Sequence, residues 1–92
     1  MDNANFTAIC RRLVAEYANI HLDRTDNAGI SAEDVYVVWL CKVLKNNKAL
    51  LSTPLPDGMY YEITYNGEKD EFYLDAYRKF ENRRIKLQGE KQ

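Results

Sequence analysis

The segment from Val35 to Leu44 constrains the fold of this chain most strongly, because it is apolar on both of its alternating sets of residues. Most of its side chains are β-branched or aromatic, and such residues favour a strand over a helix. Its longest apolar run, Val35 to Cys41, is seven residues long, far too short to cross a bilayer. We therefore expect a strand over 35–44 that needs cover on both faces, and no membrane segment.

The N-terminal region has the pattern of an amphipathic helix over residues 5–22. Its apolar residues recur at spacings of three and four, as on one face of an α-helix; they are Phe6, Ile9, Cys10, Leu13, Val14, Tyr17 and Ala18. Asn5 is the expected N-cap, because its side-chain oxygen can accept a hydrogen bond from an amide of the first turn. We expect the stripe Phe6, Ile9, Leu13, Val14 and Tyr17 to pack on a sheet.

Three further strands are expected after the first. A turn over 45–47 leads into a return strand over 48–53, since Asn tolerates the left-handed backbone of a tight reversal. A second hairpin pairs residues 59–65 with 71–77, and Asn66-Gly67 is a strong signal for its turn.

Two helical alternatives remain open in this part of the chain. Ser31 and Asp34 resemble a capping box that could open a second helix through 35–44. A short C-terminal helix over 75–82 competes with the end of the last strand, because Ala76 and Phe80 also fit a helical period.

These elements predict a single α+β domain over residues 1–92, in which the N-terminal helix covers one face of a four-stranded antiparallel sheet. The content of 46% hydrophobic and 29% charged residues is that of a folding chain. We expect Trp39 in the core. In a simple meander the strand over 35–44 would form an exposed apolar edge, which invites pairing with other chains. Either a homodimer joins this strand of two copies, or the strand order places it inside the sheet.

The charge and the cysteines narrow the class of protein. A net charge of -1 gives no overall basic field for nucleic acid or an anionic membrane, although residues 78–92 form a basic tail. Cys10 and Cys41 have no metal-ligand spacing and lie in apolar segments, so we expect free thiols in a reduced, cytoplasmic protein.

No catalytic or metal constellation is evident. His21 is the single histidine, and the four glycines are too scattered to form a phosphate loop. The acids Glu62, Glu71 and Asp75 are candidates for holding magnesium or for acid/base work, but a solvated sheet face explains the same pattern. We expect no cofactor and no enzymatic activity.

Tyrosine is the unusual residue, with seven in the chain and five of them in the second hairpin. A half-buried sheet face accounts for such a cluster, and an aromatic binding surface is the functional interpretation. The candidate binding residues are Tyr60, Tyr73, Tyr77, Arg78, Lys79, Arg83 and Arg84. The acidic net charge favours a protein partner, with a nucleic acid or a nucleotide as the alternative.

Four segments, together with the N-terminal amphipathic helix, carry a family resemblance over nearly the whole chain. They are VYVVWLCK (35–42), NNKALLST (46–53), DGMYYEITYNG (57–67) and DAYRKFEN (75–82). They resemble a family of small uncharacterised proteins encoded by phages and prophages of Gram-positive bacteria. The resemblance implies a phage accessory role in the bacterial cytoplasm, and it brings no catalytic residue, ligand or cofactor with it.

Overall fold

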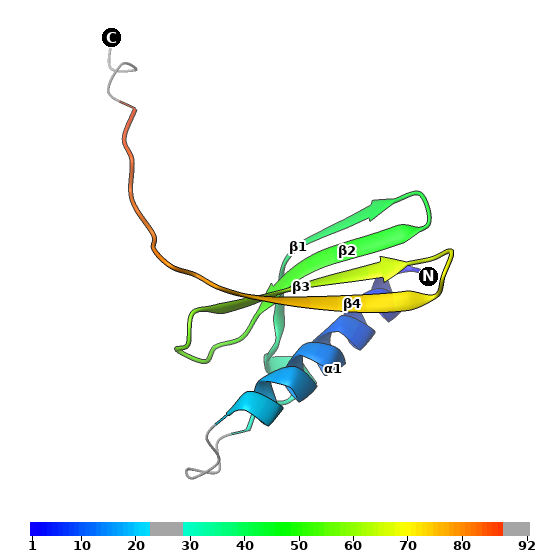
Figure 1. The fold of residues 1–92 in the computed structure, drawn as a ribbon, viewed down its shortest axis with the longest axis horizontal. Helices are drawn as coiled ribbons and strands as arrows, with labels where there is room; N and C mark the ends of the chain where they lie inside the picture. Colours follow the sequence, from blue (N-terminus) through cyan, green and yellow to red (C-terminus); the bar gives the residue numbers. More distant parts are fainter. Residues whose placement is uncertain (23–28, 88–92) are drawn as a thin grey trace.

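The protein consists of one helix packed on a four-stranded antiparallel sheet, as expected from the sequence (Figure 1). The computed structural model describes residues 1–22 and 29–87, so the last part of the predicted basic tail, 88–92, lies outside the described residues. The elements in chain order are α1 (Asn3–His21), the 3₁₀ helix η2 (Ala32–Asp34), β1 (Tyr36–Val43), β2 (Asn46–Ser52), β3 (Met59–Asn66) and β4 (Glu71–Arg78). The strand order is β1-β2-β3-β4.

The core lies between α1 and one face of the sheet. From the helix, Phe6, Cys10, Val14 and Ala18 are buried, each four residues after the last. They meet side chains that alternate along the central strands: Ala49 and Leu51 of β2, and Tyr61, Ile63 and Tyr65 of β3. The predicted stripe is therefore rotated, since Ile9 and Leu13 are only half-buried.

The helix begins two residues earlier than expected. Asp2, and not Asn5, is the N-cap: Asp2 Oδ1 accepts a hydrogen bond of 2.8 Å from the Asn5 backbone N–H. The Ser31–Asp34 pair does form a cap, in which the Ser31 N–H donates to Asp34 Oδ2 at 2.8 Å. It serves only the three-residue turn η2, and the chain continues as the strand β1, so the second helix does not form.

Both hairpins form, but their turns differ from the predicted ones. The first turn consists of Leu44 and Lys45, and Leu44 has the positive φ of 57°. Asn46 and Asn47 belong to β2, because they pair with Asn66 and Tyr65 of the neighbouring β3. The turn between β3 and β4 spans residues 67–70, with a positive φ at Asp70.

Gly67 has a role that its place in the turn signal did not predict. Among the glycines, positive φ is found at Gly58 and not at Gly67. A Cβ atom on Gly67 would lie 2.1 Å from the Lys45 carbonyl oxygen. The glycine is needed because the turns of the two hairpins touch backbone to backbone at one end of the sheet.

Trp39 is not in the core, which corrects the sequence expectation. The pairing of β1 with β2 is regular except at Val38, where a β-bulge separates Val37 from Trp39. One extra residue reverses the alternation of faces. Val37 therefore lies opposite Leu51 on the helix side, whereas Trp39 lies opposite Leu50 on the far side and is 42% exposed.

β1 forms an edge of the sheet, so the alternative in which it lies inside is wrong. Its side chains are exposed except for the half-buried Val37. At the other edge, β4 continues as a strand to Arg78, and residues 79–87 have no regular secondary structure. The short helix over 75–82 is therefore not formed.

Candidate binding surface

The sheet face opposite α1 has no covering element among the described residues. We call it the open face and define it by the strand register, since residues paired across neighbouring strands point to the same side. It comprises Tyr36, Trp39, Cys41 and Val43 of β1, Asn46, Lys48, Leu50 and Ser52 of β2, Tyr60, Glu62, Thr64 and Asn66 of β3, and Glu71, Tyr73, Asp75 and Tyr77 of β4.

Aromatic side chains lie at both edges of the open face. Trp39 and Tyr36 come from β1, and Tyr73 and Tyr77 from β4, where they are 47% and 52% exposed. Tyr60 of β3 lies opposite Tyr77. Exposed aromatic rings on one continuous face are typical of interaction surfaces, because a partner that covers them removes much apolar area from contact with water.

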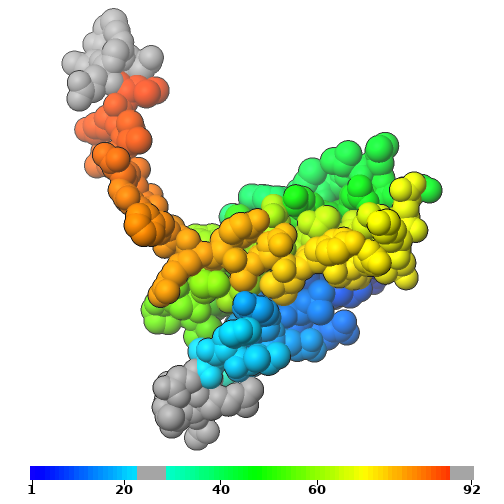
Figure 2. All heavy atoms as spheres, in the orientation of Figure 1, coloured from blue at the N-terminus to red at the C-terminus, as the bar shows by residue number. Residues whose placement is uncertain are grey.

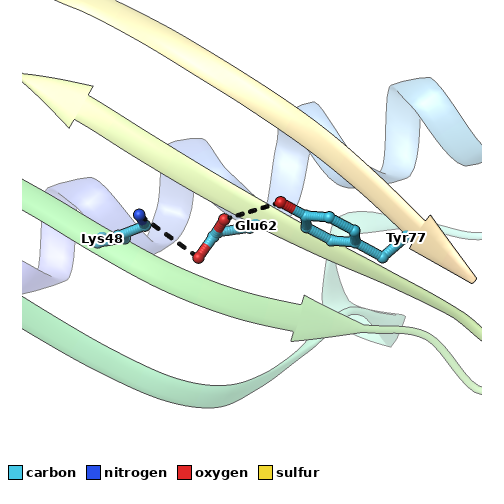
Figure 3. Close-up of polar contacts among 3 residues, drawn as sticks. All are labelled: Lys48, Glu62 and Tyr77. Atoms are coloured by element: carbon cyan, nitrogen blue, oxygen red, sulfur yellow. Dashed lines mark hydrogen bonds and ion pairs between the residues drawn. The ribbon is translucent and has the colours of Figure 1, made fainter. Parts of the chain in front are cut away.

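Glu62 is the polar centre of this face, between the two aromatic edges (Figure 3). Its Oε2 lies 3.5 Å from Lys48 Nζ, and its Oε1 accepts a hydrogen bond of 3.3 Å from the Tyr77 hydroxyl. The negative charge of Glu62 raises the pKa of Tyr77, and burial and the charge of Asp75 add to this effect. Glu62 thus holds one aromatic ring and one cation in place on the open face.

The predicted binding residues do not form one tyrosine/arginine surface. Tyr60, Tyr73 and Tyr77 lie on the open face. Lys79 joins them at one corner, where its N–H donates to the Gly58 carbonyl at 2.7 Å and its Nζ lies 5.7 Å from the centre of the Tyr60 ring.

Arg78 lies on the helix side, because it is paired with Met59 at the end of β4. There it lines a hollow of about 280 Å³ between the end of α1 and β3, together with Tyr17, His21, Asp57 and Tyr61. The Tyr17 ring stacks on His21, with 4.2 Å between ring centres. Burial raises the pKa of Tyr61, and the charge of Asp57 adds to it. Arg78 is therefore separated from the open-face tyrosines, Tyr60, Tyr73 and Tyr77, by the thickness of the sheet.

Arg83 and Arg84 lie on the segment 79–87, which runs away from the sheet (Figures 1 and 2). Arg83 Nε is 3.4 Å from Glu81 Oε2 within the same segment. Three apolar side chains on it, Phe80, Ile85 and Leu87, are 97%, 76% and 73% exposed. The two arginines are thus presented to solvent and not to the tyrosines.

The open face contains residues that the sequence analysis did not select. Trp39, Tyr36 and Leu50 join the surface because of the bulge at Val38 and the strand register. The sequence did hold a signal for them, since β1 is apolar on both alternating sets and α1 covers one face only. The bulge itself has no such signal in the sequence, and the expectation that Trp39 lies in the core is therefore wrong.

The three acids considered for metal or acid/base chemistry are not brought together. Glu62 and Asp75 are direct cross-strand neighbours, but Glu71 is paired with Asn66, four residue pairs further along the same two strands. Within residues 1–22 and 29–87 no group of three or more His, Cys, Asp or Glu side chains is placed to hold a metal ion. The Glu71 carboxylate instead accepts a hydrogen bond from the Tyr73 hydroxyl, which raises the pKa of Tyr73.

Comparison with known proteins supplies a family but no activity. In the described part of the chain, no helix is both long and apolar enough to cross a membrane. A search of the curated proteins gives no match, and a search of the solved structures gives none. The model of a family of unknown function, DUF6275, matches residues 7–87, which include most of the helix, all four strands and the exposed segment after β4. The chain therefore belongs to the DUF6275 family of unknown function.

Proposed function

We propose that this protein is a phage or prophage accessory protein that is not an enzyme and that acts by binding a host or phage protein through its open face. The uncovered aromatic face, with Trp39 at one edge and Tyr77 at the other, is the observation that carries the proposal. The phage context rests on the sequence resemblance, and the bacterial cytoplasm as the place of action rests on that resemblance together with the two free cysteines.

The charge of the open face indicates the chemistry of the partner. Three acids, Glu62, Glu71 and Asp75, stand against two bases, Lys48 and, at one corner, Lys79. Lys48 already lies beside Glu62. Such a face repels phosphate groups and favours a protein surface that presents arginine or lysine beside apolar side chains. A protein partner therefore fits the open face better than a nucleic acid does.

The proposal is tested by capture from prophage-bearing cells followed by reconstitution with the purified captured protein. The chain has one tryptophan, Trp39, which lies on the open face and reports its burial by fluorescence. We expect the captured protein to shift Trp39 emission to shorter wavelength. The double variant Tyr73→Ala with Tyr77→Ala is expected to weaken binding by about thirtyfold or more, as for interface residues of hot-spot strength.

Ile20→Ala is the matched control, because Ile20 is a large apolar residue that is 73% exposed on the helix and not on the sheet. It is expected to bind as the wild type does. Equal binding by the tyrosine double variant, an unchanged Trp39 emission, or the absence of any specific partner contradicts the proposal.

Binding of a nucleic acid or a nucleotide is the second candidate, favoured by the Lys79 ammonium over the Tyr60 ring beside Tyr77. It requires salt-dependent binding that Arg83→Glu with Arg84→Glu weakens. A thermal unfolding temperature that is unchanged across a panel of single strands and nucleotides removes this candidate.

A further inference from the structure

The two edges of the sheet differ in a way that singles out β1. In β4, three of the eight residues are charged, Glu71, Asp75 and Arg78, whereas β1 has one charged residue, Lys42. Charged side chains are a common protection of an edge strand, whose outer N–H and C=O groups are free to pair with another strand. β4 has this protection and β1 largely lacks it, so β1 is the edge suited to pairing.

The exposure of β1 on both faces gives the same result. On the helix side Leu40 is 38% exposed, and on the open face Trp39 and Val43 are 42% and 58% exposed. Adding a strand beside β1 reduces this exposure on both faces at once, whereas a partner lying on the open face alone leaves Leu40 in water.

We propose that β1 pairs antiparallel with β1 of a second copy of this chain, so that two four-stranded sheets become one. The β1 strands of two copies match each other, because β1 is apolar on both faces and carries too little charge for the two strands to repel. Antiparallel self-pairing is closed by a two-fold axis and leaves no further apolar edge. Pairing of β1 with β4 of another copy would instead leave one β1 edge open and continue into a chain of molecules.

The bulge defines the register of this pairing. It interrupts β1 at Val38, and the regular part of the strand that remains is Trp39–Val43. A symmetric antiparallel pairing of these residues is centred on Cys41, which places Trp39 opposite Val43 of the second copy. Residues directly opposite in antiparallel strands have Cα atoms about 4.5–5.5 Å apart. That separation suits a disulfide, and Cys41 is an exposed free thiol while Cys10 is buried.

A pairing this short buries less than the roughly 1,200–2,000 Å² of a standard interface, so the dimer is expected to dissociate at about micromolar concentration. The first measurement is therefore the mass of the reduced protein as a function of concentration, by sedimentation. We expect it to rise from 10.8 kDa to twice that value. A monomer up to about 1 mM overturns the proposal, including the case in which a strand of a foreign protein is the true occupant of this edge.

The second measurement is oxidation by diamide, which accepts two protons and two electrons as two Cys41 thiols join in a disulfide. The matched control is Cys41→Ser with Lys42→Cys, which moves the exposed thiol by one residue to the other face of β1. In the proposed register position 42 lies opposite Leu40, so this variant is expected to form the linked dimer at least about tenfold more slowly, because collision alone must then bring its thiols together. Equal rates for the two proteins overturn the register.

The third measurement separates the two edges. Val43→Lys places a charge opposite Trp39 and is expected to abolish both dimer and disulfide, with an unchanged circular dichroism spectrum. Tyr73→Lys makes the same change on exposed β4 and is expected to leave the dimer intact. The reverse result overturns the proposal. None of these readouts involves a captured partner, so their failure is distinct from a failure of the proposed function.

Discussion

At the scale of single residues, the two cysteines differ in burial, although the sequence pattern predicts the same environment for both. Both were expected to act as small hydrophobes in apolar segments, and both are free thiols. Cys10 fits the expectation: it is fully buried in the helix stripe between Phe6 and Val14. Cys41 does not, because the bulge at Val38 and the edge position of β1 leave it exposed. The same shift explains the exposure of Trp39.

Burial of Cys10 predicts a loss of stability at alkaline pH. Desolvation of the thiolate raises the pKa of Cys10 from 9.0 to about 12. Between these values the unfolded chain releases a proton that the folded chain keeps, so the free energy of unfolding falls as pH rises from 9 toward 12. In Cys10→Ala we expect a smaller fall over this window, in urea unfolding measured at each pH.

The comparison with Cys10→Ala is needed because the pKa values of several tyrosines, among them Tyr61 and Tyr65, are also raised. These groups titrate in both proteins, so the difference between the two pH profiles isolates Cys10. Parallel profiles, offset only by the constant cost of the smaller side chain, would show that the Cys10 thiol is not desolvated in the folded protein.

At the scale of elements, local sequence signals located the helix and strands but not the residues that carry the turns. Asn66-Gly67 correctly indicated a hairpin, yet the positive φ lies at Asp70. The Asn66 side chain instead accepts hydrogen bonds from the N–H groups of Glu68 and Lys69 at 3.0 and 3.2 Å. The contact of Gly67 with Lys45 joins turns 22 residues apart in sequence, and no local pattern encodes such a contact.

The contact between the two turns predicts the cost of a side chain at Gly67. Gly67→Ala places a Cβ against the Lys45 carbonyl and forces the backbones apart, so we expect the free energy of unfolding to fall by about 1–3 kcal/mol. Gly29→Ala is the control, because the nearest atom to its Cβ would be Asn19 Oδ1 at an ordinary 3.6 Å. We expect it to change stability by less than about 0.5 kcal/mol in the same urea experiment. Similar values for the two variants would show that the turns do not constrain each other.

At the scale of the whole molecule, one helix covers one face of the sheet, and much apolar surface stays exposed in the described part of the chain. Most of the exposed large apolar side chains lie on the open face, on the edge strand β1 and on segment 79–87. We propose a foreign protein as the partner of the open face and a second copy of the chain as the partner of β1. The third, segment 79–87, is present in the sequence as apolar residues within a basic tail, and its exposure sets it apart from the folded core.

Because segment 79–87 is exposed, we expect substitutions of its apolar residues to leave the free energy of unfolding nearly unchanged. Phe80→Ser, Ile85→Ser and Leu87→Ser together remove its three large apolar side chains, which are 73–97% exposed. We expect the free energy of unfolding to stay within about 0.5 kcal/mol of the wild type in urea. Leu51→Ala, in the buried core, is expected to cost about 2–5 kcal/mol and shows that the measurement detects lost packing. A comparable loss in the triple variant would mean that the segment packs on the sheet in solution.

The sequence by itself determined the α+β class, the two hairpins and the ends of each strand to within two residues, because periodicity and turn residues act locally. The order of the strands, with β1 at an edge, came from the tertiary structure. The tertiary structure alone decided which face each side chain occupies after the bulge. It also decided that Arg78 is separated from Tyr60 and Tyr77, and that Gly67 meets Lys45. These outcomes depend on strand register and on contacts between distant segments. A shift of one residue in a strand reverses every face beyond it while barely changing the local sequence pattern.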